Sequence, residues 1–121
     1  MKITDIQALG ANLGGGNHIY VKVLTDEHLI GYGEAYRAGP DRSVVAAVEY
    51  LKDWLVGEDP TRIEHLWRIM HNGSRFPGGS IVNAAISGIE TALWDIKGKA
   101  HGVPVYQLLG GRCRDKIRVY L

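Results

Sequence analysis

The chain has 121 residues, and its 14 Lys and Arg against 13 Asp and Glu give a formal net charge of +1. This length suits one domain with a hydrophobic core, and the near-neutral charge gives no field that would attract nucleic acid or an anionic membrane. The single cysteine, Cys113, excludes an internal disulfide, no apolar run is long enough to span a membrane, and the first residues lack the blocks of a signal peptide. We therefore expect a soluble, cytoplasmic protein.

The first part of the sequence has the alternation of apolar and polar residues that is typical of β-strands. We predict three strands, over residues 2–9, 18–25 and 29–36; the alternation is clearest in 18–25, whereas 2–9 carries apolar residues without clean alternation. The second and third are joined by turn residues and form a predicted hairpin. Gly31 and Gly33 lie on one side of the third strand, where a neighbouring backbone or side chain is expected to come close. The glycine run at residues 14–16 predicts a loop between the first two strands.

In the second part of the chain the apolar residues recur every three to four positions, which indicates helices. Asp41 is the predicted N-cap of a first helix that ends at Gly57. Asp59 is predicted to cap a second helix, with Pro60 at its first position. This second helix is expected to end before Gly73. The predicted apolar faces consist of Val44, Val48, Leu51 and Leu55 in the first helix and of Ile63, Leu66, Trp67 and Met70 in the second.

A long helix, with Ser80 as its predicted N-cap and Gly102 at its end, is the element around which the chain is organised. Its apolar stripe consists of Ile86, Ile89, Leu93, Ile96 and Ala100. Its first half is also rich in small residues, namely Ala84, Ala85, Ser87, Gly88 and Ala92, so other backbone segments can approach it closely. Pro104 then opens a short helix through Leu109. Strands followed by helices predict an α+β fold, in which one face of a three-stranded antiparallel sheet is covered by a helical layer.

The end of the chain carries a further extended segment. Residues 112–116 are predicted as a linker and residues 117–121 as a strand, because apolar and polar residues alternate there. A strand needs a neighbour for its backbone groups, and after Gly111 this chain offers none except the sheet already formed. The segment therefore indicates that the sequence is the front part of a longer protein.

The residue types that carry chemistry do not form a catalytic or metal-binding motif in this sequence. The five histidines are dispersed without metal-ligand spacing, and Glu90 and Asp95 lie about 140° apart on the long helix. The glycine-containing segments lack the remaining residues of nucleotide-binding motifs, and Cys113 has no histidine nearby in the sequence. We expect surface or interface charges and an ordinary thiol, with no nucleophile, base or metal cluster in this chain.

Two loops display polar side chains that suit ligand binding. Residues 14–18 join the glycine run to Asn17 and His18. Residues 36–40 hold Tyr36 beside Arg37, an aromatic ring next to a bidentate anion binder. Because the exits of the first and third strands lie at one end of such a sheet, the two loops are expected to meet. Ordinary surface loops are the alternative interpretation of the same pattern.

A family resemblance is carried by ALWDIKGKA at residues 92–100, GVPVYQLLGG at residues 102–111, IRVY at residues 117–120 and GYGEA at residues 31–35. Over essentially the whole chain, the sequence resembles the mandelate racemase and muconate lactonizing enzyme branch of the enolase superfamily. The resemblance implies that residues 1–111 form an N-terminal capping domain. It also implies that residues 112–121 are a linker and the first strand of a (β/α) barrel that is missing from this chain.

Enzymes of that family abstract a proton α to a carboxylate with a Lys or His base, and a bound Mg²⁺ ion stabilises the enediolate. The resemblance implies that the bases and the Mg²⁺ ligands sit on later barrel strands, so this chain alone is expected to be inactive. It implies that the two loops contact the substrate, through Asn17, His18, Tyr36 and Arg37. The implied partners are a small-molecule carboxylate, the C-terminal barrel domain and further copies of the chain, because family members commonly assemble.

Within the family, the sequence is most similar to acid-sugar dehydratases such as galactonate or mannonate dehydratases, with paired glycines at residues 78–79 before the long helix. Many of those enzymes carry Arg directly before the glycines, whereas this chain has Pro77 there and Arg75 two positions earlier. The lid of a racemase or cycloisomerase therefore stays an alternative. A further alternative is a non-catalytic module that docks through the edge at residues 117–121 and the small residues around Gly88.

Overall fold

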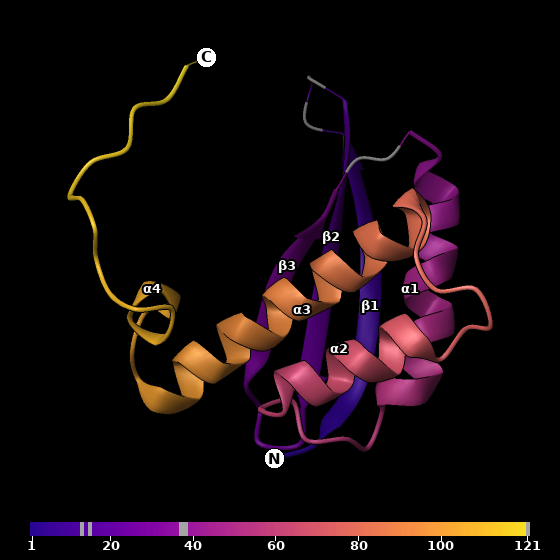
Figure 1. The fold of residues 1–121 in the computed structure, drawn as a ribbon, viewed down its shortest axis with the longest axis horizontal. Helices are drawn as coiled ribbons and strands as arrows, with labels where there is room; N and C mark the ends of the chain where they lie inside the picture. The colour runs from indigo at the N-terminus through magenta and orange to yellow at the C-terminus, as the bar shows by residue number, and fades with distance from the viewer. Residues whose placement is uncertain (13, 15, 37–38, 121) are drawn as a thin grey trace.

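The computed structural model describes residues 1–12, 14, 16–36 and 39–120. Three strands come first and helices follow (Figure 1). The elements are β1 (Ile3–Asn12), β2 (Asn17–Thr25), β3 (Ile30–Ala35), α1 (Asp41–Leu55), α2 (Ile63–Asn72), α3 (Ser80–His101) and α4 (Val105–Leu108). The strands form one antiparallel sheet in the order β1-β2-β3. The predicted α+β fold is confirmed.

The register of the sheet divides its residues between a buried and an open face. Ile6 pairs with Val23, and Val23 pairs with Gly31, and this row faces the helices. Three positions further along β1, Leu9 pairs with Tyr20 and Tyr20 pairs with Glu34 on the opposite face, where Leu9 is half exposed. The alternation predicted for β2 is therefore confirmed, since its Ile19, Val21 and Val23 side chains are all buried.

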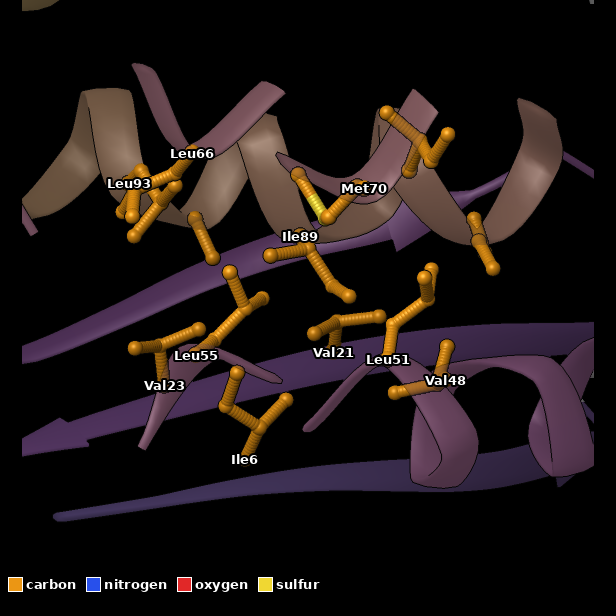
Figure 2. Close-up of a cluster of buried hydrophobic side chains, with 14 of the residues drawn as sticks. Ile6, Val21, Val23, Val48, Leu51, Leu55, Leu66, Met70, Ile89 and Leu93 are labelled. Carbon is orange, nitrogen blue, oxygen red and sulfur yellow. The ribbon is translucent and has the colours of Figure 1, made fainter. Parts of the chain in front are cut away.

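Two helices lie directly on one face of the sheet, and a third lies against one of them. α1 packs on β1 and α3 packs on β3 and β2, while α2 lies against α3 (Figure 1). Figure 2 shows side chains from β1, β2, α1, α2 and α3 meeting in one core, with Leu66 and Met70 of α2 above Ile89 and Leu93 of α3. No helix among the described residues has the length and apolar character needed to cross a membrane.

Two glycines allow α3 to lie directly on β3. A Cβ atom at Gly33 would lie 2.1 Å from the carbonyl oxygen of Gly88, and one at Gly31 would lie 2.1 Å from that of Ala92. Both distances are far below van der Waals contact, so no side chain fits at either position. The close approach predicted at Gly31 and Gly33 is confirmed. Gly88 is itself buried against Val21 and Ala35, and the nearby Ala84, Ala85 and Ala92 are buried too, so these small residues pack inside the domain.

The outer edge of β3 is protected by side chains of α3. The Tyr32 backbone N–H donates to the Asp95 carboxylate over 2.9 Å, and Lys99 Nζ donates to the Ile30 carbonyl over 2.7 Å. Asp95 and Lys99 also form an ion pair with each other, at 2.7 Å. Because an edge strand with unpaired backbone groups is a template for aggregation, this pair closes part of that edge. Asp95 therefore acts as a structural residue in this domain.

The predicted helix starts are wrong in detail. Pro40 and Gly79 hold the N-cap positions of α1 and α3, and Asp41 and Ser80 are the first helical residues without a capping hydrogen bond. Asp59 does not start α2, which begins at Ile63. Its carboxylate instead accepts hydrogen bonds from the backbone N–H and the hydroxyl of Thr61, over 2.9 and 2.8 Å, and these bonds lower the pKa of Asp59. The Asp59 carboxylate therefore stabilises a turn before α2 and does not cap the helix.

Other boundaries also differ from the predicted ones. β1 runs to Asn12, beyond the predicted end at residue 9, because its last residues pair with the start of β2. Ala100 is exposed, since α3 continues past the sheet toward α4 (Figure 1). Residues 117–120 form no strand and extend away from the domain, because no paired backbone lies beside them in the described part of the chain. The predicted end of α3 at Gly102 is confirmed, with the left-handed φ of 66° that a glycine cap allows.

Candidate functional site

The candidate site lies at the end of the sheet where β1 passes into β2 and β3 passes into α1. Figure 1 shows the end of β1, the start of β2, the end of β3 and the start of α1 at one end of the domain, opposite the N-terminus. A direct hydrogen bond joins their bases, because Asn17 Nδ2 at the start of β2 donates to Asp41 Oδ2 at the start of α1 over 3.0 Å. This bond places the end of the first loop beside the residue that directly follows the second loop.

Asn17 is held from two sides. Its Oδ1 atom accepts a hydrogen bond from Asn12 Nδ2 over 3.2 Å, while its Nδ2 atom donates to Asp41. Asn12 Oδ1 in turn accepts from the Gly14 backbone N–H over 3.0 Å. The other carboxylate oxygen of Asp41 is buried and has no hydrogen-bond partner among the described residues. This chain of amides fixes the base of the β1–β2 connection to the first turn of α1.

His18 is the next side chain along β2, and it points to the open face of the sheet. Its Nδ1 atom lies 2.7 Å from Glu34 Oε1 on the neighbouring strand β3. Its ring is stacked beside the ring of Tyr20, with centroids 6.2 Å apart and an angle of 13° between the planes. The imidazole is therefore restrained by a hydrogen bond on one side and by an aromatic ring on the other.

Two hollows adjoin these residues, and His18 lines both. The first, of about 460 Å³, lies between the β1–β2 connection and α1. Its lining consists of Gly10, Ala11, Asn12, Asn17, His18, Ile19, Asp41, Arg42 and Val45. The second, of about 430 Å³, is lined by His18, Glu34, Tyr36 and Ser87. Both volumes fall in the range of small-molecule sites, about 300–1,000 Å³.

The structure brings three of the four predicted site residues to this end of the sheet. Asn17 and His18 share the first hollow, and His18 and Tyr36 share the second. Tyr36 is 76 % exposed, so its ring is accessible to a ligand. Arg37 lies outside the described residues.

Sequence reasoning missed Glu34 and Ser87 and gave Asp41 only a helix-capping role. A signal for Glu34 was present in the hairpin register. Glu34 pairs with Tyr20, which places it diagonally across from His18 on the same face of the sheet. Ser87 had no such signal, because its position depends on how α3 lies on β3.

The described part of the site offers hydrogen-bonding groups rather than a cluster of metal ligands. Among the described residues, no three His, Cys, Asp or Glu side chains gather as metal ligands. Away from this site, near the start of β1, Lys52 donates to Asp5 and lowers the pKa of that carboxyl. The free thiol of Cys113 is exposed in the segment after α4. This arrangement can orient and enclose a polar molecule.

A three-stranded antiparallel sheet followed by helices matches the N-terminal domain structures of enolase superfamily members. Residues 11–110 match the family model of the mandelate racemase / muconate lactonizing enzyme N-terminal domain. The chain belongs to this family.

Similar proteins include enzymes that act on acid sugars. The D-galactonate dehydratase of Pectobacterium atrosepticum is 52 % identical over 102 residues, which are 84 % of this chain and 27 % of that protein. An enolase from Pantoea ananatis, solved with bound D-gluconate and Mg, is 43 % identical with a TM-score of 0.90 over 94 % of this chain and 28 % of that one. An enolase from Agrobacterium radiobacter, with bound Na and L-malate, is 41 % identical with a TM-score of 0.93 over 99 % of this chain and 30 % of that one. The chain thus spans less than a third of each of these proteins.

Proposed function

We propose that this chain is the substrate-enclosing N-terminal domain of an acid-sugar dehydratase, and that D-galactonate or a related sugar acid is its substrate. The observation that carries the proposal is the 52 % identity to a D-galactonate dehydratase across most of this chain. The D-gluconate in the structure of the Pantoea ananatis relative supports the same class of ligand. The polar end of the sheet offers the hydrogen-bonding groups that a polyhydroxylated acid requires.

In this proposal the chain supplies binding and enclosure, and the chemistry belongs to a C-terminal barrel domain. His18, Tyr36 and Arg37 contact the substrate, with Arg37 suited to a carboxylate. Asn17 contributes from a position that Asn12 and Asp41 fix by hydrogen bonds. Among the described residues no three His, Cys, Asp or Glu side chains gather, and in this proposal the ion that the family uses, and the groups that move the proton, belong to the barrel.

A domain exchange tests the proposal. Residues 1–111 would replace the matching domain of the Pectobacterium atrosepticum D-galactonate dehydratase, and dehydration of D-galactonate and D-gluconate would be followed with added Mg²⁺. We expect turnover of an acid sugar by the chimera and none by the 121-residue chain alone. A folded chimera that dehydrates no sugar acid would contradict the proposal and would favour the alternative lid, that of a racemase or cycloisomerase. Turnover by the isolated chain would refute the division of roles.

The cellular setting and assembly of the enzyme are part of the same proposal. A single cysteine and a near-neutral charge suit the cytoplasm. Further copies of the complete protein are the expected partners in a homo-oligomer, which sedimentation of the chimera would detect.

A further inference from the structure

The pair of His18 and Glu34 has a geometry that a simple surface contact does not need. We propose that Glu34 is a positioning residue, which holds the His18 imidazole so that its Nε2 atom is presented to a hydroxyl group of the ligand. This inference rests on the proposed function only for the identity of the ligand. The positioning itself is a property of this chain.

The sheet brings the two side chains together on its open face. Tyr20 and Glu34 are direct cross-strand partners, and His18 lies two residues before Tyr20 on the same face of β2. This diagonal arrangement lets the Glu34 carboxylate reach His18 Nδ1, which donates to it over 2.7 Å. The His18 side chain is 32 % exposed and that of Glu34 is 52 % exposed, so the imidazole is the more enclosed of the two.

The hydrogen bond to Glu34 determines which ring nitrogen of His18 is available to a ligand. With Nδ1–H committed to Glu34, the opposite nitrogen, Nε2, stays available in a direction fixed by the ring. The flat ring of Tyr20 beside it limits rotation further. The same logic applies to metal-bound histidines, where a carboxylate on one ring nitrogen sets the tautomer and orientation of the other.

The charge of Glu34 also selects the ligand group that suits this nitrogen. A negative carboxylate 2.7 Å from the ring cancels the charge of a protonated imidazole, so the pair does not attract an anion. A neutral ring held in this way accepts a hydrogen bond at Nε2, and a protonated ring donates one. A hydroxyl can serve either form, whereas a carboxylate can only accept. Tyr36 and Ser87, which line the same hollow, add two more hydroxyl groups that suit a polyol.

The positioning can be measured on the 121-residue chain itself. Long-range ¹H–¹⁵N NMR spectra at alkaline pH report which ring nitrogen of His18 carries the proton, after assignment with a His18→Gln variant. We expect an Nδ1-protonated ring in the wild type, loss of this state in Glu34→Ala, and retention of part of it in Glu34→Gln, which keeps an acceptor oxygen. Glu27→Gln, an exposed carboxylate paired with the N-terminus at 2.7 Å, is the matched control and should change nothing at His18. A His18 ring that is Nε2-protonated in the wild type, or unaltered in Glu34→Ala, would overturn the proposal.

The consequence for the ligand is measured in the domain-exchange enzyme. We expect Glu34→Ala to lower kcat/KM for D-galactonate about tenfold to a hundredfold, as for loss of a charged hydrogen bond, and to have no further effect when His18 is already alanine. Additive losses would show that Glu34 acts independently of His18 and would overturn the coupling. Failure of the unsubstituted chimera would count against the proposed function, while the NMR result would still decide the positioning.

Discussion

Replacing Gly33 with alanine tests the close contact between β3 and α3. The new Cβ would lie 2.1 Å from the Gly88 carbonyl oxygen and 2.9 Å from the Ala92 backbone nitrogen. Both neighbours are backbone atoms of one long helix, so no side-chain rotation can make room. In an open position, the same substitution in a strand would stabilise the protein slightly, because glycine loses more backbone entropy on folding. A loss of stability in Gly33→Ala would therefore come from the clash with α3, since the entropy change alone would stabilise the protein.

The size of the effect follows from the displacement that the clash demands. Ordinary contact begins near 3.4 Å, so Gly33→Ala requires β3 and α3 to separate by more than 1 Å at this point. A gap of about 0.5–1 Å already forfeits a quarter to a half of each dispersion contact across the interface. We expect a loss of about 3 kcal/mol in the free energy of unfolding, the upper end of the usual cost of overpacking. Such a loss is a large part of the roughly 5–15 kcal/mol that stabilises a domain.

Urea denaturation followed by circular dichroism measures this loss, with Gly10→Ala as the matched control. Gly10 lies in β1 of the same sheet, and a Cβ there would meet nothing within 4 Å. With an m-value of about 1.5 kcal/mol per molar urea, Gly33→Ala should lower the midpoint by roughly 2 M, whereas Gly10→Ala should stay within about 0.5 kcal/mol of the wild type. Equal midpoints for the two variants would refute the close-contact argument.

Three further substitutions probe the core, the sheet edge and the acid stability. Leu93→Ala should cost about 2–5 kcal/mol in urea unfolding, because Leu93 is fully buried. Asp95→Ala frees the Tyr32 backbone N–H at the edge of β3; it should cost about 1 kcal/mol and increase aggregation in size-exclusion chromatography. The bond to Lys52 lowers the pKa of Asp5 in the folded state. Asp5 therefore stabilises the fold fully above its unfolded pKa of about 3.9, and this stabilisation is lost as the pH falls through its lower pKa in the folded state. Asp5→Asn should therefore unfold with a flatter acid dependence, and an unchanged urea midpoint-against-pH curve would contradict this.

The fold was predictable where one local pattern matched one tertiary contact. The alternation in β2 and the stripe of Ile86, Ile89, Leu93 and Ile96 in α3 each faced the core as predicted. The ends of helices and strands were harder to predict, because they depend on which of several local hydrogen bonds forms. Asp59 used its carboxylate in a turn with Thr61, and β1 lengthened because pairing with β2 satisfied its last residues. Residues 117–120 have strand-like alternation but no backbone partner in the described structure, and alternation without pairing forms no strand.

The candidate site was predictable in its place but not in its internal bonds. Loop composition and strand direction indicated Asn17, His18 and Tyr36, which lie together at the end of the sheet. The partners of these residues depend on register and on helix placement. Glu34 could be inferred from the hairpin register, whereas the bond from Asn17 to Asp41 requires the position of α1, which composition does not set.

Gly33 and Glu34 are neighbours on β3 and face opposite sides of the sheet. The first permits the packing of α3 and tolerates no side chain, and the second contacts His18 on the open face and is half exposed. Substitution at position 33 should therefore change stability, while substitution at position 34 should change the ring of His18 with little effect on unfolding, since exposed ion pairs contribute at most about 1 kcal/mol. Because strand alternation separates the two demands, residues on the open face can vary with the ligand while the packing that positions them stays fixed.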